Sequence, residues 1–95
     1  MSDSMLHELE QVIHQRRTDM PDGSYTVTLF NKGTNKIAQK VGEEATEVVI
    51  AALAEGRDEQ IGEIADLFYH TLVLMAQLDL SLEDIEAKLR DRHMK

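Results

Sequence analysis

Two pairs of acidic residues, each pair spaced three positions apart, are the residues of this chain best suited to chemistry. Glu44 and Glu47 form the first pair, and Glu63 and Asp66 form the second. Residues three apart in a helix project from the same side. If the two segments pack as neighbouring helices, four carboxylates converge and repel one another. A hard cation such as Mg²⁺ resolves that repulsion, because it prefers oxygen ligands.

The segment around the first pair also fits an ordinary amphipathic helix. On a helical wheel, its apolar face holds Ile37, Val41, Ala45, Val48 and Ala52, and the opposite face holds Lys36, Lys40, Glu43 and Glu47. Glu44 lies at the boundary, where it can pair with Lys40 four residues earlier. Taken alone, this segment favours a solvated charged face as much as a metal site.

The segment around the second pair changes that balance. Its apolar residues cover most of the helical circumference: Ile61, Ile64, Ala65, Leu67, Phe68, Leu72, Leu74, Met75 and Leu78. A helix of this kind should be buried on several sides. Glu63, Asp66 and His70 nevertheless share one narrow stripe, which Gln77 extends. Acids on a largely buried helix are costly unless they are paired or bind a metal, so a metal site is favoured.

The residue types in the stripe predict Mg²⁺ or Mn²⁺ rather than iron or zinc. A ferritin-like di-iron site uses Glu-x-x-His on its helices, whereas Asp66 stands at that spacing from Glu63. Histidines four residues apart do not occur, and the chain has no cysteine. The cluster is therefore oxygen-rich, which is typical of Mg²⁺ and Mn²⁺ sites.

Four other residues are candidates for contact with a phosphorylated ligand. Lys36 and Lys40 lie one turn apart and can act as point charges toward phosphate. Pairing with Glu43 and Glu47 at the surface explains these lysines equally well.

His70 can orient Asp66 or touch the ligand, although a core histidine satisfied by a neighbour fits the spacing at least as well. Tyr25 lies in a Ser-Tyr-Thr segment that either closes over a ligand or is only part of a loop.

The predicted fold class is all-α, with four to five helices in a bundle. The expected helices are residues 5–16, 34–55, 58–78 and 81–92, with a loop at 18–33 marked by Pro21 and Gly23. A short extended piece at Val27, Leu29 and Phe30 is a further guess within that loop. No run shows convincing strand alternation.

Four residues near the ends of these helices have capping roles. Gly56 is a good residue to end the second helix and to make the tight turn of an antiparallel hairpin. Asp58 is the expected N-cap of the third helix. Ser81 can cap the fourth helix while Asp84 reaches back to it, a weak capping box.

Composition bounds the function. The chain has 95 residues, 42% hydrophobic and 29% charged, which indicates one folded domain spanning 1–95. So short a domain has a small core, and association with a second copy would enlarge it. The net charge of −8 argues against binding nucleic acid or an acidic membrane surface. The N-terminus has no signal-peptide pattern, and the absence of cysteine fits a reducing cytoplasm.

The acidic pairs are similar to the paired motif of the all-α nucleoside triphosphate pyrophosphohydrolases. The wider runs KVGEEATEVVIAA at 40–52 and EIADLFYHTLVLMA at 63–76 are more specific. Together with Ser24-Tyr25-Thr26, Gly33 and Lys36, they resemble the phosphoribosyl-ATP pyrophosphohydrolase family, over nearly the whole chain.

That resemblance implies hydrolysis of 1-(5-phosphoribosyl)-ATP to 1-(5-phosphoribosyl)-AMP and pyrophosphate, the second step of histidine biosynthesis. It implies Mg²⁺ held by Glu44, Glu47, Glu63 and Asp66, which would neutralise the triphosphate and activate a water. Glu47 and Glu43 are the catalytic candidates, with Glu43 as a further ligand, a general base or an indirect support. Lys36, Lys40, Tyr25 and His70 are the substrate-binding candidates.

The resemblance also implies a homodimer and a stand-alone form, because the chain is too short for the fused cyclohydrolase of some relatives and lacks its zinc-binding cysteines. A housekeeping nucleotide pyrophosphatase of the same superfamily is the main alternative. A non-catalytic helical dimerisation module, in which the acids serve only solubility, is the alternative from another class. It requires Glu63 and Asp66 to point away from Glu44 and Glu47.

Overall fold

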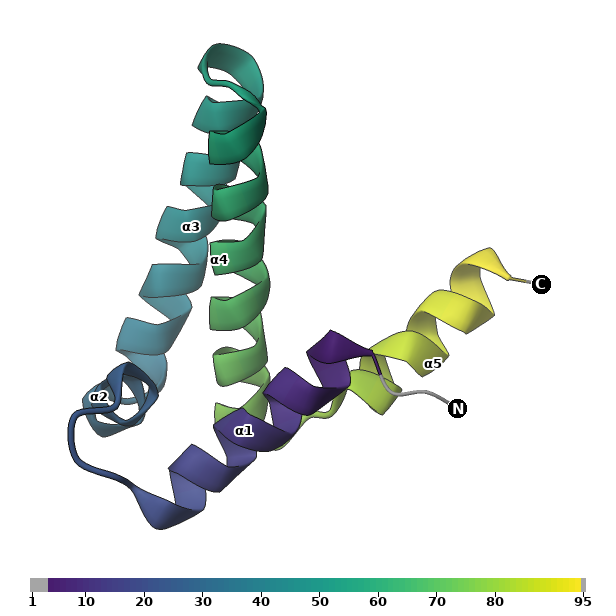
Figure 1. Cartoon of the computed structure of the whole chain (residues 1–95). Coiled ribbons are helices and arrows are strands. Elements are labelled where there is room, and N and C mark those ends of the chain that lie inside the picture. The colour runs from purple at the N-terminus through teal and green to yellow at the C-terminus, as the bar shows by residue number, and fades with distance from the viewer. Residues whose placement is uncertain (1–3, 95) are drawn as a thin grey trace.

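The computed structural model describes residues 4–94, and these residues form five α-helices (Figure 1). The helices are α1 (Met5–Asp19), α2 (Tyr25–Lys32), α3 (Thr34–Ala54), α4 (Arg57–Gln77) and α5 (Leu82–His93). The described part of the chain contains no strand, so the all-α prediction is confirmed. Residues 1–3 and 95 of the predicted domain lie outside the described residues. Within 4–94, no helix has the length and hydropathy needed to cross a membrane.

The antiparallel pair α3 and α4 is the framework of the molecule, as predicted (Figure 1). The side-chain amide of Gln60 closes the turn between them by donating to the carbonyls of Ala51 and Glu55, at 3.2 and 3.1 Å. The predicted N-cap at Asp58 was wrong, because Gly56 occupies that position with extended backbone and no side-chain cap. Asp58 instead lies in the first turn of α4, where its charge still favours the helix dipole.

The segment between α1 and α3 departs from the prediction. Half of the expected loop at 18–33, including the guessed extended piece, is helix α2. Ser24 caps this helix by accepting a hydrogen bond from the backbone N–H of Val27 at 3.3 Å. Val27 and Leu29 are buried, and this packing outweighs the strand preference of the β-branched run Thr-Val-Thr.

The hydrophobic core lies at the open end of the hairpin, where α1 and α2 pack against α3 and α4 (Figure 1). Its buried members are Ile13, Leu29, Ile37, Leu72, Val73, Met75 and Ala76. Ile37 is fully buried, as its place on the predicted apolar face requires, whereas Ala52 on that face is exposed and Ala51 is buried instead. All the core residues that α4 contributes lie in its C-terminal half.

Helix α5 projects from this end of the hairpin (Figure 1). Ser81 and Asp84 form both hydrogen bonds of the predicted capping box. The backbone N–H of Leu82 donates to the carboxylate of Glu10 at 2.7 Å, which ties the start of α5 to α1.

Candidate metal centre and substrate site

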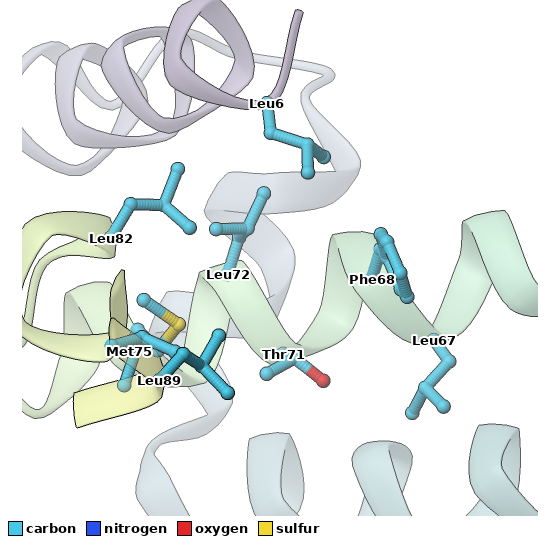
Figure 2. Close-up of a pocket in the computed structure, with 9 residues that line it drawn as sticks. Leu6, Leu67, Phe68, Thr71, Leu72, Met75, Leu82 and Leu89 are labelled. Carbon is cyan, nitrogen blue, oxygen red and sulfur yellow. The ribbon is translucent and has the colours of Figure 1, made fainter. Parts of the chain in front are cut away.

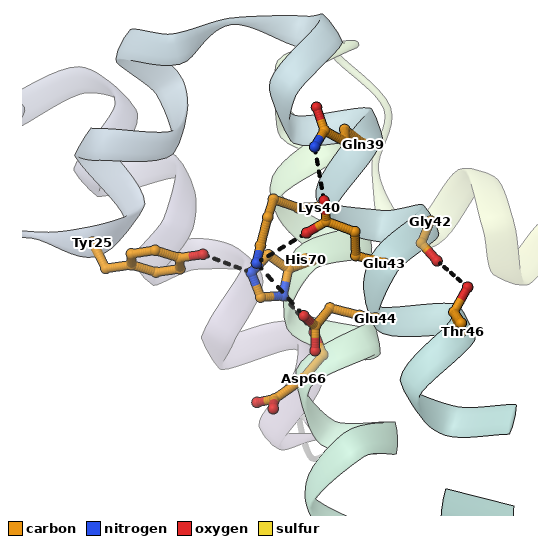
Figure 3. Close-up of polar contacts among 9 residues, drawn as sticks. All are labelled: Tyr25, Gln39, Lys40, Gly42, Glu43, Glu44, Thr46, Asp66 and His70. Atoms are coloured by element: carbon orange, nitrogen blue, oxygen red, sulfur yellow. Dashed lines mark hydrogen bonds and ion pairs between the residues drawn. The ribbon is translucent and has the colours of Figure 1, made fainter. Parts of the chain in front are cut away.

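Three of the four predicted metal ligands come together across the α3–α4 hairpin. Glu44 of α3 and Glu63 and Asp66 of α4 each offer a carboxylate oxygen, and these oxygens lie within 4.8 Å of one another. Glu44 and Glu63 are partly buried, and Asp66 is exposed. Figure 3 shows the carboxylates of Glu44 and Asp66 on the same side of the hairpin. The acids of the two helices thus face each other, contrary to what the dimerisation-module alternative requires.

The fourth predicted ligand, Glu47, lies beside this group rather than in it. Burial and the charges of Glu47, Asp66 and Glu44 together raise the pKa of Glu63 above its ordinary value of 4.5. Glu47 is the strongest of those charges, so it is close enough to act on the site. Burial and nearby negative charge both raise a carboxyl pKa, because each disfavours the ionised form.

Lys40 supplies part of the missing positive charge. Its Nζ atom lies 3.5 Å from Oε1 of Glu43 and 3.7 Å from Oε2 of Glu44. These acids follow Lys40 by three and four residues in the same helix. Burial lowers the pKa of Lys40, but Tyr25, Glu43 and Glu44 outweigh that effect and raise it. The i,i+4 pair of Lys40 with Glu44 is therefore confirmed, and one lysine serves two carboxylates at the edge of the site.

Glu43 is held apart from the three clustered carboxylates. Its exposed carboxylate accepts a 2.7 Å hydrogen bond from the side-chain amide of Gln39 (Figure 3). This bond, followed by the charges of Lys40 and Lys36, lowers the pKa of Glu43. A carboxylate with a lowered pKa is a weaker base, so this environment suits an electrostatic or supporting role better than general-base catalysis. Lys36 lies near enough to Glu43 to contribute to that effect.

His70 is a buried, fully hydrogen-bonded residue on the acidic stripe. Its Nδ1 lies 2.7 Å from the backbone carbonyl of Asp66, and its Nε2 lies 3.0 Å from the hydroxyl of Tyr25. A carbonyl can only accept, so Nδ1 carries the proton and, in the neutral ring, Nε2 accepts from Tyr25. His70 thus contacts the backbone of Asp66 rather than its carboxylate, and it links α4 to the start of α2.

Two residues of this network were missed by the sequence analysis. The hydroxyls of Thr26 and Tyr69 form a short hydrogen bond between α2 and α4. The rings of Tyr25 and Tyr69 stack with their centroids 6.2 Å apart. Thr26 belongs to the Ser-Tyr-Thr segment and Tyr69 precedes His70, but their pairing depends on α2 being a helix, which the sequence analysis treated as loop.

The donor set of the cluster fits a hard divalent cation. The three clustered donors are carboxylates that come from two helices. Burial, followed by the charges of neighbouring acids, raises the pKa of Glu63 among them. A bound Mg²⁺ keeps several water molecules and also takes phosphate oxygens as ligands. Asp66 is exposed, so a cation held by these carboxylates would still face solvent.

Comparison with known proteins gives one consistent result. Residues 6–93 match the family model described as phosphoribosyl-ATP pyrophosphohydrolase. The chain is 51% identical over 88 residues to a phosphoribosyl-ATP pyrophosphatase of Metallosphaera sedula, covering 93% of this chain and 95% of that protein.

It is also similar to two histidine biosynthesis bifunctional proteins HisIE. The identities are 49% over 88 residues for that of Vibrio cholerae and 48% over 89 residues for that of Bacillus subtilis. These matches cover 93% and 94% of this chain but only 42% and 43% of the two bifunctional proteins. The chain thus spans less than half the length of either bifunctional relative.

Proposed function

The chain belongs to the phosphoribosyl-ATP pyrophosphohydrolase family, and we propose that it hydrolyses 1-(5-phosphoribosyl)-ATP to 1-(5-phosphoribosyl)-AMP and pyrophosphate, the second step of histidine biosynthesis. The observation that carries this proposal is the convergence of Glu44, Glu63 and Asp66 in a chain 51% identical to a phosphoribosyl-ATP pyrophosphatase. The absence of cysteine suits a reducing compartment, and we place the activity in the cytoplasm.

The three clustered carboxylates would hold Mg²⁺, or Mn²⁺ in its place, with Glu47 as a further ligand. When bound, the cation supplies neutralisation of the triphosphate and a more acidic water at the α–β phosphoanhydride. The carboxylates themselves orient the site, because they project from two helices whose spacing is set by the hairpin. Little covalent chemistry falls to the protein, so positioning and charge neutralisation carry the rate.

Lys40 is the residue of this chain best placed to respond to substrate. Its ammonium group already lies between Glu43 and Glu44. If a cation occupied Glu44, Lys40 would remain paired with Glu43 and could contact a phosphate oxygen as a point charge. Lys36, one turn earlier, would add a second positive charge on the same side of α3. Glu47 is the better candidate to hold the attacking water, since Glu43 has a lowered pKa.

We also propose that the active form is a homodimer. Several large apolar side chains of the α3–α4 hairpin are exposed in one chain, including Leu53 at 83% and Ile61 at 54%. An apolar groove of about 340 Å³ lies between α1, α4 and α5, with Leu6, Phe68, Leu72 and Leu89 in its wall (Figure 2). These exposed apolar side chains and this groove support an interface that a second copy would cover.

The dimer proposal is tested by light scattering during gel filtration. The expected mass is twice the chain's 10.8 kDa. Ile64→Glu places a charge on the exposed apolar side of α4 and should shift the protein toward the monomer. A wild-type protein that elutes as a monomer at micromolar concentration would reject this part of the proposal.

The catalytic proposal is tested by ³¹P NMR of the purified protein with Mg²⁺ and phosphoribosyl-ATP, beside ATP as the control substrate. Release of pyrophosphate and phosphoribosyl-AMP, with ATP left intact, is the expected result. Cleavage of ATP or of another free nucleotide in preference would instead identify a housekeeping pyrophosphatase of the same superfamily. A protein that cleaves no nucleotide with Mg²⁺ or Mn²⁺ would contradict both.

A further inference from the structure

Tyr25 presents an aromatic ring beside the acidic cluster in a fixed position. Its hydroxyl is bonded to buried His70, which is bonded in turn to the backbone of Asp66. Figure 3 shows the hydroxyl end of the ring pointing from the start of α2 toward His70 and Lys40, and Lys40 in turn is paired with Glu44. A single hydrogen-bonded path therefore runs from this ring to the helix that carries two of the clustered acids.

The fixed ring is nevertheless half exposed. Tyr69 stacks against Tyr25, and His70 meets it edge-on with ring centroids 5.8 Å apart. These contacts still leave 50% of the residue accessible. The hydroxyl is thus held by a buried partner while half of the residue stays accessible, an arrangement that can offer apolar surface to a ligand.

Among the described residues, Tyr25 is the exposed tyrosine or phenylalanine ring that lies on the His70 and Lys40 side of the acidic cluster. The chain has two tyrosines and two phenylalanines. Phe68 is exposed but lines the apolar groove with α1 and α5 (Figure 2). Phe30 lies under the guanidinium of Arg17, and Tyr69 is bonded to Thr26. Of the two exposed rings, Tyr25 is therefore the one available to a planar ligand whose phosphates bind at the acidic cluster.

We propose that Tyr25 is the platform on which the adenine of the substrate stacks and that it contributes to selection of the phosphoribosylated base. This inference rests on the proposed function. Attachment of a ribosyl group at N1 leaves the adenine ring positively charged near neutral pH, whereas the adenine of ATP is neutral. A cationic ring is attracted to the electron-rich face of a tyrosine in addition to stacking on it.

The anchoring bond to His70 strengthens this platform by holding the ring in place before the ligand arrives. A ring that is already ordered loses little conformational entropy on binding. The stacking itself comes from the aromatic ring and not from its hydroxyl group. Removal of the hydroxyl alone should therefore have a smaller effect on binding than removal of the ring.

The test compares Tyr25→Leu with Tyr25→Phe, which both lack the bond to His70 and differ only in the ring. With phosphoribosyl-ATP and Mg²⁺, Tyr25→Leu should raise KM roughly 10-fold, as expected for loss of one base–aromatic stack. Tyr25→Phe should raise it by no more than about 3-fold. In both variants kcat should change little, because stacking is equal in the ground state and the transition state.

Tyrosine fluorescence gives a second measurement that does not require a folded Tyr25 variant. The chain has no tryptophan, so Tyr69→Phe leaves Tyr25 as the sole tyrosine. Saturation of this protein with phosphoribosyl-AMP should quench its emission, and AMP should quench it only at higher concentration.

Equal KM values for Tyr25→Leu and Tyr25→Phe, or unchanged emission at saturating phosphoribosyl-AMP, would overturn the inference while leaving the proposed function intact. Lack of turnover by the wild-type protein would instead overturn the proposed function, and the inference with it.

Discussion

The two halves of α4 have opposite relations to the rest of the chain. From Tyr69 to Gln77 the helix is packed by α1 and α2, and it supplies Leu72, Val73, Met75 and Ala76 to the core. From Arg57 to Phe68 it contributes no buried residue, and it exposes apolar side chains next to acids.

The difference separates stability from function along one helix. The C-terminal half holds the fold together by burial and by hydrogen bonds to α2. The N-terminal half holds Glu63 partly buried beside other acids, which disfavours its charged form. Sites of this kind commonly reduce stability in exchange for activity.

The largest effect on stability should come from the C-terminal half. Leu72→Ala removes a buried side chain from the core and should lower the free energy of unfolding by about 2–5 kcal/mol. Urea denaturation followed by circular dichroism measures this change.

Ile61→Ala in the N-terminal half is the matched control. Because Ile61 is half exposed in one chain, its loss should cost the fold of that chain far less. Its main effect should be a rise of roughly 10-fold in the dissociation constant of the dimer. Equal destabilisation by the two substitutions would mean that the halves of α4 do not differ.

The pH dependence of stability should reveal the strain at Glu63. Its pKa is raised above 4.5 in the folded chain, so the folded state retains a proton at pH values where the unfolded state has lost it. The charged carboxylate therefore destabilises the fold above the folded pKa, and the penalty disappears as pH falls from 7 toward 4.5. In EDTA, Glu63→Gln should be more stable than the wild type at pH 7.

The other acids titrate in both the wild type and Glu63→Gln, so the difference in stability between the two proteins reports mainly on Glu63. The stability difference should shrink as pH falls, because protonation relieves the wild type and cannot affect the amide. A difference that stays constant between pH 7 and 4.5 would show that burial and the neighbouring acids do not raise the pKa of Glu63.

The smallest effect should come from the link between α2 and the C-terminal half. Thr26→Val keeps the shape of the side chain but removes its hydrogen bond to Tyr69. The free energy of unfolding should fall by about 1 kcal/mol. Tyr69→Phe already lacks the tyrosine hydroxyl of this bond. In that background, Thr26→Val should therefore lower the free energy of unfolding by less. Additive losses would show that the two hydroxyls do not interact.

The sequence predicted the hairpin and its acids because helical periodicity reports directly on which residues share a face. Glu63 and Asp66 stand three residues apart on a strongly apolar helix. Gly56 marks the turn that brings this helix back along the one that carries Glu44. These signals are local, and the structure brings the carboxylates within 4.8 Å.

Helix α2 was not predicted because its signals conflict. Thr26 and Val27 favour strands, while the cap at Ser24 and the burial of Leu29 favour a helix. Burial against α1 and α3 decides the outcome, and no local pattern reports it. The contacts of Tyr25 with Tyr69 and His70 depend on this helix, so they could not be foreseen either.

The most direct test of the account is the Mg²⁺ dependence of pyrophosphate release from phosphoribosyl-ATP. It should be measured for the wild type, for Glu63→Gln and for Glu59→Gln, which removes an exposed acid from the same half of α4. The wild type and Glu59→Gln should saturate with Mg²⁺ and stop in EDTA, whereas Glu63→Gln should be at least about 100-fold slower at every Mg²⁺ concentration. Wild-type activity that survives EDTA, or a Glu63→Gln variant with the Mg²⁺ response of Glu59→Gln, would contradict the metal centre.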